Sequence, residues 1–401
     1  MAGGVSWRAR EATSGPQLSA YRRNIVAVMV TMAGATLGYS FILPLLSLIL
    51  ERQGTSSTLI GLSVAGEAVA VFLVAPFAPL LLARLGPVQT MLFAIALRLV
   101  TFLLMPVFPN VWAWFPLRLL GGAGASLMWI VSEAWINQTV DDRNRGRMLS
   151  FYSMALAFGY ALGPLLLAQT GTEGWSPFIA GAAIMVASAG GTLIASGAAP
   201  TLGGTASARM RSFFRLASLA MMCCFVTASV DTTLVALLPL YGASVGLAPS
   251  EALYLLTVMG FGGFVLQYPF GWLADRTDRR RLTLIIAVLM LLGSLTLPWA
   301  LPQAPYNLIF AFFFGGLIGA LYTMGNVLIG ERFQGADLAT ATTFYAVMWN
   351  VAALVAPPVA GAGMDISPDL GLPLAVTLMV ATILPFAIPA ALRGRPPKDL
   401  P

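Results

Sequence analysis

Four charged side chains stand inside long apolar stretches, and they are the groups best placed to pair with one another or to exchange a proton. They are Glu67, Arg98, Arg118 and Asp231. If each stretch is a helix that rises about 1.5 Å per residue, all four lie roughly 8–15 Å below the same end of their segments. Charges at such a depth in a membrane usually pair or line a water-filled cavity. We therefore take all four as candidates for proton coupling.

Because these charges lie at a similar depth, some of them can form ion pairs with one another. Glu67 lies in the same half of the chain as Arg98 and Arg118, so we predict that it pairs with one of the two arginines. The alternative for Arg118 is a side chain that snorkels to the membrane surface. Asp231 has no obvious partner in the second half of the chain.

Asp231 is the best single candidate for a group that takes up and releases a proton. Burial disfavours the charged form of a carboxylate, and a nearby arginine favours it. We therefore predict that Asp231 carries the proton and that Arg118 tunes it. The alternative is a structural acid that caps a polar contact.

The remaining composition excludes several kinds of catalytic site. The sequence has no histidine, which excludes a histidine-based triad, a histidine metal site and a histidine proton relay. Cys223 and Cys224 are adjacent in an apolar run and cannot form a zinc site. We also find no nucleophile–base pair, metal-ligand set or nucleotide motif. We therefore expect no cofactor and no metal, and an intramembrane enzyme is the alternative that this pattern disfavours.

The elements that position these residues are helices that span a membrane. The chain has 401 residues, of which 58% are hydrophobic and 9% charged, whereas a soluble domain has roughly a quarter charged residues. Apolar runs of about 20 residues, long enough to cross a bilayer, recur along its length. This predicts an all-α integral membrane protein with 12 transmembrane helices. The expected spans are 24–50, 59–83, 88–107, 113–136, 148–170, 176–198, 216–241, 251–273, 282–300, 307–330, 339–361 and 372–392.

The cations are distributed unequally between the two sets of loops. Of the 22 Lys and Arg residues, 19 fall in the termini and in loops on the same side, whereas the opposite loops contain only Arg52. Because cytoplasmic loops carry the excess of Lys and Arg, both termini are expected in the cytoplasm of a bacterial cell whose inner membrane holds the protein. The net charge of +6 lies in short loops, so nucleic acid is not an expected partner.

The two halves of the chain repeat with an offset near 193 residues. Pro76-Phe77 matches Pro269-Phe270, and Gly121-Gly122 matches Gly315-Gly316 at 194, among five matches in the same order. Six helices lie between corresponding points, so the halves are parallel repeats about an axis normal to the membrane. The expected organisation is an N-terminal tail at 1–23, a first bundle at 24–198, a linker at 199–215, a second bundle at 216–392 and a C-terminal tail at 393–401.

A loop in the second half carries the strongest local motif. The stretch 271–282 contains Gly271, Asp275, Arg276, Arg279 and Arg280 at spacings that resemble motif A of the major facilitator superfamily (MFS), although Asp278 replaces the second glycine of that motif. The resemblance implies the MFS fold, with two pseudo-symmetric six-helix halves, and a conformational latch between these halves. The alternative is an ordinary basic loop.

The corresponding loop of the first half, 78–86, has no acid, which puts a latch at that position in doubt. Glu133, at the end of the fourth helix, is a candidate partner for Arg84 instead. The alternative is an acid that snorkels alone to the surface.

Two further stretches resemble family motifs. Arg118 and the glycines that follow it resemble motif B, which implies proton coupling by Arg118. Gly159, Gly163 and Pro164 resemble the core of motif C, which is associated with proton-driven exporters. The alternative for the latter is ordinary close packing of membrane helices.

The family resemblance also suggests a central cavity between the halves. Its candidate lining residues are aromatic or amide side chains and suggest a pocket for an apolar or weakly polar solute. They are Tyr39, Trp129, Tyr160, Gln267, Tyr322, Asn326, Trp349 and Asn350.

From these features we predict a monomeric secondary transporter whose partners are the lipid bilayer, protons and a small-molecule substrate. The expected function is export of a small hydrophobic or amphipathic solute in exchange for protons. One alternative is proton-coupled uptake of a sugar, organic acid or other metabolite. Another is a receptor or scaffold that does not transport, which the preserved motif A disfavours.

Overall fold

The computed structural model describes residues 16–139, 145–194, 217–333 and 335–393, and nearly all of them are helical. Twelve segments in this part of the chain are long and apolar enough to cross a membrane, which confirms the expected number. The predicted linker at 199–215 lies outside the described residues. The helices are α1 (Pro16–Arg52), α2 (Ser57–Val74), α3 (Ala78–Leu104), α4 (Val111–Thr139), α5 (Arg145–Thr170), α6 (Ser176–Ile194), α8 (Ser218–Ser244), α9 (Pro249–Arg276), α10 (Arg279–Ala300), α11 (Tyr306–Arg332), α12 (Gly335–Ile366), α13 (Gly371–Ala381) and α14 (Leu384–Arg393).

The largest differences from the expected spans at helix starts are those of α1 and α3. Helix α1 starts at Pro16, although its membrane-length part starts at Arg23. Helix α3 starts at Ala78, but Gly86 interrupts it with a φ of 76°, and Pro87 follows. Glycine adopts this left-handed conformation without the clash that a side chain would cause. The stretch from 78 to 85 therefore turns away from the membrane-spanning part of α3.

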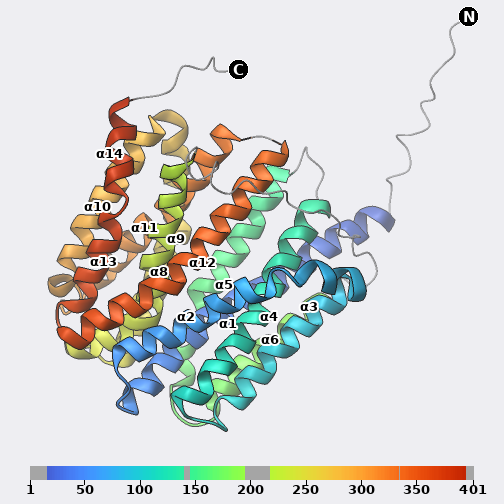
Figure 1. Ribbon diagram of the computed structural model, residues 1–401, viewed down its shortest axis with the longest axis horizontal. Coiled ribbons are helices and arrows are strands. Elements are labelled where there is room, and N and C mark those ends of the chain that lie inside the picture. The colour runs from blue at the N-terminus through green and yellow to red at the C-terminus, as the bar shows by residue number, and fades with distance from the viewer. Residues whose placement is uncertain (1–15, 140–144, 195–216, 334, 394–401) are drawn as a thin grey trace, which may run out of the picture.

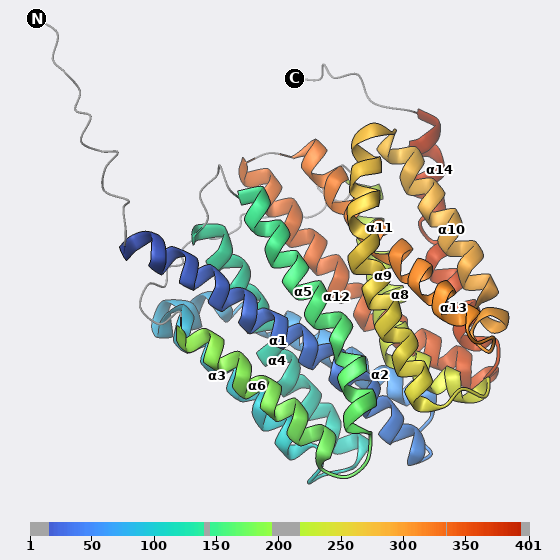
Figure 2. The same ribbon diagram turned by 180° about the vertical axis from the view of Figure 1, so that it is seen from behind.

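The helices form two groups of six spans, α1–α6 and α8–α14 (Figures 1 and 2). The same packing contact occurs in both groups. A Cβ atom on Gly122 of α4 would lie 2.7 Å from the backbone oxygen of Glu67 on α2, and one on Gly315 of α11 would overlap the backbone oxygen of Met259 on α9. Glycine is therefore needed at the matching position of each half, as expected if the halves are repeats.

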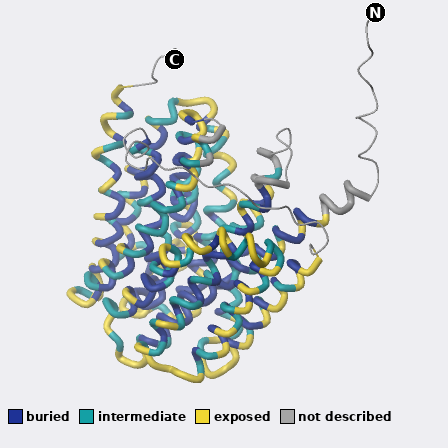
Figure 3. The backbone as a smooth tube through the Cα atoms, turned by 45° about the vertical axis from the view of Figure 1, so that its right-hand side comes forward, coloured by how far each residue is buried: buried dark blue, intermediate teal, exposed yellow. Residues whose placement is uncertain are grey.

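Both ends of the described chain lie on the same side of the molecule, because the number of spans is even (Figure 1). We call this side, which holds Pro16 and Arg393, the terminal face, and the other side the opposite face. Buried residues fill the interior of each group, and exposed residues follow the outer surfaces of the helices (Figure 3). Many of these exposed residues are large and apolar, such as Leu378 and Ile309, which is appropriate for a surface that contacts lipid.

The two halves meet most closely near the opposite face. There α2 packs against α12, and α5 packs against α9. Gly61 of α2 lies directly against the backbone of Pro357 and Pro358. Asp365, near the end of α12, accepts hydrogen bonds from the backbone nitrogens of Ser57 (2.8 Å) and Thr58 (2.9 Å). The carboxylate thus caps the N-terminus of α2 from the other half.

The same helices separate toward the terminal face (Figures 1 and 2). Phe77 follows the end of α2 and is 61% exposed, and Tyr268 and Trp272 near the end of α9 are 81% and 51% exposed. A Cβ atom on Gly271 would meet nothing within 4 Å. The structure is therefore closed between the halves at the opposite face and open at the terminal face.

Candidate functional site

The charged residues of the first half form a buried ion pair. Glu67 of α2 and Arg118 of α4 lie with Oε1 and Nη1 3.7 Å apart, and their side chains are 12% and 0% exposed. Gly66 and Gly122 flank this contact, since their α-carbons face Arg118 and Glu67. The predicted pairing of Glu67 with an arginine is therefore present, and Arg118 is the partner.

Arg98 of α3 lies beside this pair. It is 4% exposed and close enough to Glu67 and Tyr39 to interact with both electrostatically. The single Glu67 carboxylate thus faces two guanidinium groups. Within the described residues, Nε of Arg98, all three nitrogens of the Arg118 guanidinium and Oε2 of Glu67 form no hydrogen bond. Leaving buried polar groups without hydrogen bonds is costly, so the ion pair is the main compensation for burying these charges.

Asp231 binds a partner from the other half of the chain. The hydroxyl of Tyr160 on α5 donates a hydrogen bond of 2.5 Å to Oδ2 of Asp231 on α8. The ring of Tyr160 stacks on that of Tyr39 with centroids 6.2 Å apart. Tyr39 in turn lies within electrostatic range of both the Glu67–Arg118 pair and Asp231. Tyr39 and Tyr160 thus connect the charges of the first half to the carboxylate of the second.

Arg118 is not the immediate partner of Asp231 in this conformation, and the tuning of Asp231 by Arg118 stays a prediction. Arg118 faces Glu67, and the hydrogen-bond partner of Asp231 is Tyr160. The reason is that α1 packs against both α4 and α8 and so stands between the helices that carry Arg118 and Asp231. Tyr160 was expected in the cavity but not as this partner, because a contact between halves leaves no signal in the spacing of residues along one helix.

A second polar group lies nearer the terminal face and contains Glu133. Its Oε1 accepts a hydrogen bond of 2.8 Å from the indole of Trp129, one turn earlier on α4. Glu133 is also within electrostatic range of Tyr152 on α5 and Tyr322 on α11. Tyr322 contacts the ring of Trp349 on α12 edge to face, with centroids 5.8 Å apart.

The expected ion pair between Arg84 and Glu133 is not formed in the described part of the structure, where the partner of the Glu133 carboxylate is Trp129. Arg84 is exposed and precedes the bend at Gly86, which directs this stretch of α3 away from the span. Because of this bend, Arg84 does not approach Glu133.

The three amide side chains of the predicted cavity form no hydrogen bond between the halves in the described residues. Asn326 and Asn350 donate hydrogen bonds to the backbone oxygens of Tyr322 (3.1 Å) and Ala346 (2.8 Å), one turn earlier in their own helices. Gln267 on α9 is half-buried.

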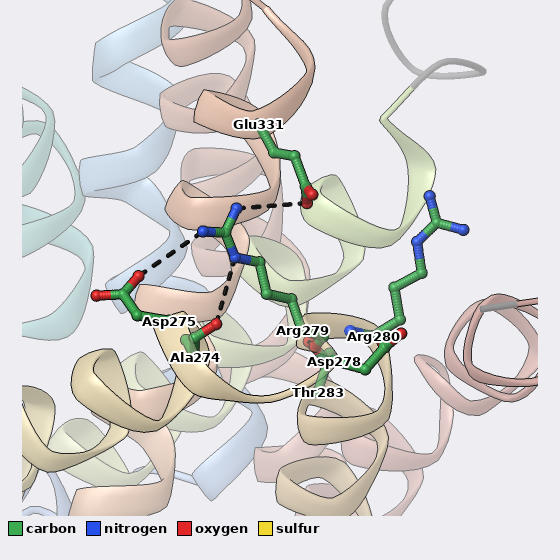
Figure 4. Close-up of polar contacts among 7 residues, drawn as sticks. All are labelled: Ala274, Asp275, Asp278, Arg279, Arg280, Thr283 and Glu331. Carbon is green, nitrogen blue, oxygen red and sulfur yellow. Dashed lines mark hydrogen bonds and ion pairs between the residues drawn. The ribbon is translucent and has the colours of Figure 1, made fainter. Parts of the chain in front are cut away.

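In the described part of the chain, Asp275 and Arg279 of the motif between α9 and α10 pair with groups of their own half (Figure 4). Asp275 is 77% exposed, and its Oδ1 lies 3.7 Å from Nη2 of Arg279. Nη1 of Arg279 lies 3.6 Å from Oε2 of Glu331 on α11, and its Nε donates to the backbone oxygen of Ala274. The sequence did not indicate Glu331, although its place at the end of α11 puts it at the same membrane depth. Within the described residues, the ion pairs of Asp275 and Arg279 therefore stay inside the second half.

Two other residues of this motif have structural roles. Asp278 caps α10 by accepting hydrogen bonds from the backbone nitrogens of Arg280 (2.9 Å) and Arg281 (3.1 Å), which is a favoured role for aspartate at a helix start. The guanidinium of Arg276 lies 3.8 Å from the ring centroid of Trp272. Asp278 thus replaces the glycine of the family pattern with a residue that stabilises the loop.

The glycines of α5 serve close packing. A Cβ atom on Gly159 would lie 2.7 Å from Oγ1 of Thr36, and one on Gly163 would lie 2.7 Å from the backbone oxygen of Leu37, both on α1. Thr36 also donates a hydrogen bond to the backbone of Leu156. Pro164 follows in the same helix. This contact holds α5, and with it Tyr160, against α1.

Two parallel six-helix halves that surround polar and charged residues define a multi-pass membrane transporter. The family model described as Major Facilitator Superfamily matches residues 28–241 and 219–401, one match for each half. The chain therefore belongs to the major facilitator superfamily. Its members are transporters of small molecules and not enzymes.

Two curated bacterial relatives are similar over much of their length. An uncharacterized MFS-type transporter of Bacillus subtilis (strain 168), YfkF, is 24% identical over 374 residues, which cover 91% of this chain and 94% of the relative. An uncharacterized MFS-type transporter of Escherichia coli O139:H28, YcaD, is 26% identical over 250 residues, which cover 61% of this chain and 64% of the relative.

Two solved structures show the same fold. A D-xylose–proton symporter superposes with a TM-score of 0.72 at 16% identity, covering 90% of this chain and 96% of the symporter. A bacterial homologue of the human lysosomal transporter Spinster, in an inward-facing and unoccupied conformation, superposes with a TM-score of 0.73 at 13% identity, covering 96% of this chain and 100% of the homologue.

Proposed function

We propose that this transporter exports a small amphipathic solute from the cytoplasm in exchange for protons, with Asp231 as the proton carrier. The observation that carries the proposal is the hydrogen bond from Tyr160 to Asp231. It joins the two halves beside a cluster of buried charges, so a relative movement of the halves must change the surroundings of the carboxylate.

The proposed direction depends on the orientation of the chain. The excess of arginines at the terminal face supports a cytoplasmic position for that face. The described conformation is then open to the cytoplasm, where an exporter collects its solute. The likeness to the inward-facing Spinster homologue supports this orientation. Cysteine labelling tests it: a cysteine at Ser56 should react with an impermeant reagent added outside the cell, and one at Ser207 should not. The reverse pattern would contradict the orientation.

The proton step needs only the groups that surround Asp231. In the described state the ionised carboxylate accepts the hydroxyl proton of Tyr160 in a hydrogen bond. When the halves separate at the opposite face, α5 and α8 move apart and the carboxylate loses this donor. Because a carboxylate without a donor is less stable in its charged form, it then takes up a proton from the periplasm. Return to the described state restores the Tyr160 hydroxyl as a donor and favours release of the proton to the cytoplasm.

The charge cluster of the first half supplies the fixed part of this cycle. Glu67 and Arg118 hold each other in a buried pair, and Arg98 adds a second positive charge near Tyr39. We propose that the pair stays formed throughout the cycle and that the excess positive charge steadies the ionised form of Asp231 through the two tyrosines. One chain provides both halves and all of these residues, so a monomer is sufficient.

The latch acts at the terminal face. Asp275 is exposed and, among the described residues, pairs with Arg279 of its own loop in the open state. We propose that closure of the terminal face brings Asp275 to the N-terminal end of α5, which is a neighbour of α9. A carboxylate is stabilised there by the unpaired backbone N–H groups and the helix dipole.

The experiment that tests the function is a screen of solutes on proteoliposomes with an imposed pH gradient. Accumulation on the side from which protons leave indicates exchange. The alternative, uptake together with protons, would use the same groups, and accumulation on the side that protons enter would favour it. Transport that is indifferent to the pH gradient for every solute would contradict proton coupling.

A further inference from the structure

We infer that the transported solute is an organic cation, held between the carboxylate of Glu133 and the aromatic rings of Trp129, Tyr322 and Trp349. This inference depends on the proposed transport function and specifies its substrate class. The charges near the opening between the halves differ in sign balance from the buried cluster of Glu67, Arg98 and Arg118.

Glu133 is the charge that a solute entering from the terminal face can reach. Its side chain is exposed. Oε1 is held by the indole of Trp129. No cation contributes to the electrostatic surroundings of Glu133 in the described part of the chain. The negative charge is therefore available to a bound cation.

An aromatic side chain of the other half lies within electrostatic range of this carboxylate. Tyr322 of α11 interacts electrostatically with Glu133, and its ring lies at 90° to that of Trp349. The hydroxyl of Tyr345 donates a hydrogen bond of 2.9 Å to the backbone oxygen of Tyr322 and fixes this part of α11 against α12. Two rings set at right angles present faces in different directions, and aromatic faces attract cations electrostatically.

The depth of these residues agrees with a single site. Glu133 lies six residues before the end of α4 at Thr139, and Tyr322 lies ten before the end of α11 at Arg332. At about 1.5 Å per residue, both are roughly 9–15 Å from the helix ends at the terminal face. Glu133 and Tyr322 therefore lie at a similar depth, as a single site requires.

The arginines do not favour an anion in this conformation. Arg98 is 4% exposed and Arg118 is 0% exposed, and both lie deeper, inside the bundle of the first half. A solute at the level of Glu133 meets a carboxylate and aromatic faces but neither guanidinium group. The accessible electrostatics thus select a positively charged solute with an apolar body.

The test compares two ions of nearly equal size and shape but opposite charge, tetraphenylphosphonium and tetraphenylborate. Binding to the purified protein is measured by isothermal titration calorimetry without a pH gradient. We expect the wild type to bind the cation more tightly than the anion, and Glu133→Gln to weaken cation binding about tenfold, which is the effect of about 1.4 kcal/mol in binding free energy. Trp349→Leu should weaken cation binding a few-fold.

Controls separate loss of charge from loss of structure. Glu133→Asp keeps the charge and should retain the preference for the cation. Glu173→Gln removes an acid at the opposite face whose side chain is 88% exposed, and should change binding of neither ion. The thermal unfolding midpoint of each variant in detergent shows whether it is folded.

Equal binding of the two ions by the wild type would overturn the inference, as would wild-type cation binding by folded Glu133→Gln. The outcome is separate from that for proton exchange. Selective cation binding without proton-driven transport would retain the inference and contradict the proposed function. Proton-driven export of a neutral or anionic solute, unchanged in Glu133→Gln, would retain the function and overturn the inference.

Discussion

Tyr160 and Asp231 form a hydrogen bond of 2.5 Å although they belong to different six-helix halves. Helix α5 is held against α1 by Gly159 and Gly163, and Asp231 is central in α8. The bond therefore reports the relative position of the halves at the middle of the membrane. In a transporter that rocks between two conformations, this is where a movement of whole bundles can alter the chemistry of one carboxylate.

The Glu67–Arg118 pair should behave as a unit in a double-mutant cycle. Glu67→Gln leaves the fully buried guanidinium of Arg118 without its partner, and breaking a buried pair costs about 3–5 kcal/mol. Adding Arg118→Gln should recover about 1–3 kcal/mol of the unfolding free energy, a coupling typical of residues in contact. The measurement is thermal or denaturant unfolding in detergent. Losses that simply add would show that the two residues do not stabilise each other.

Arg98 provides the matched comparison for this cycle. It is buried next to Glu67 but forms no ion pair with it within 4.0 Å in the described structure. We therefore expect Arg98→Gln to show a smaller coupling to Glu67→Gln than Arg118→Gln does. A larger coupling energy for Arg98 than for Arg118 would show that Arg98, and not Arg118, is the main partner of Glu67.

Asp275 should control the balance of conformations and leave solute binding intact. The carboxylate is exposed in the open state and its ion pair with Arg279 is at the surface, where such pairs contribute about 0–1 kcal/mol. Asp275→Asn should therefore leave the open state stable, disfavour closure of the terminal face and slow transport several-fold. Transport in proteoliposomes and binding in detergent are measured together.

Asp337→Asn is the control for this prediction, because Asp337 is an exposed acid in the first turn of α12 at the same face. It should transport at the wild-type rate. Loss of solute binding by Asp275→Asn with an unchanged conformational balance would show that Asp275 is a ligand and not a latch.

Asp365 should stabilise closure of the opposite face. It accepts the backbone N–H groups of Ser57 and Thr58 and the hydroxyl of Thr58, so it caps α2 from α12. Loss of a helix cap costs about 1 kcal/mol. Asp365→Ala should thus move the equilibrium about fivefold toward opening of the opposite face. Spin labels at Ser176 and Ser250, one in each half, measure the distance between the halves at the opposite face.

Asp369→Asn, which alters a nearby acid, should leave the distribution of label distances as in the wild type. If Asp365→Ala also leaves it unchanged, the cap does not contribute to closure. An increase in the closed population would reverse the sign that the structure predicts.

The number of helices and the depth of the charges could be predicted from sequence because both follow from one span at a time. A backbone in lipid must satisfy its own hydrogen bonds, so apolar length alone indicates a helix. The common depth of Glu67, Arg98 and Arg118 led to the prediction that Glu67 pairs with one of the two arginines, but it did not indicate which one. The repeat at an offset near 193 residues likewise indicated the matching contacts of Gly122 and Gly315.

Contacts that depend on how helices and halves are placed could not be predicted in this way. The partner of Asp231 comes from the other half, and the spacing of residues within α8 contains no information about Tyr160. Arg84 was expected near Glu133, but the left-handed conformation of Gly86 turns its segment away. The family pattern has a glycine where Asp278 stands, so the pattern did not indicate that this residue caps α10.

The most direct test of the account is solute accumulation in proteoliposomes that contain Asp231→Asn. An asparagine retains the shape of the side chain and cannot carry the proton. With the solute that the screen identifies, we predict that exchange of solute down its own gradient persists and that accumulation driven by the pH gradient is lost. Accumulation by Asp231→Asn with the pH dependence of the wild type would contradict the claim that Asp231 carries the proton.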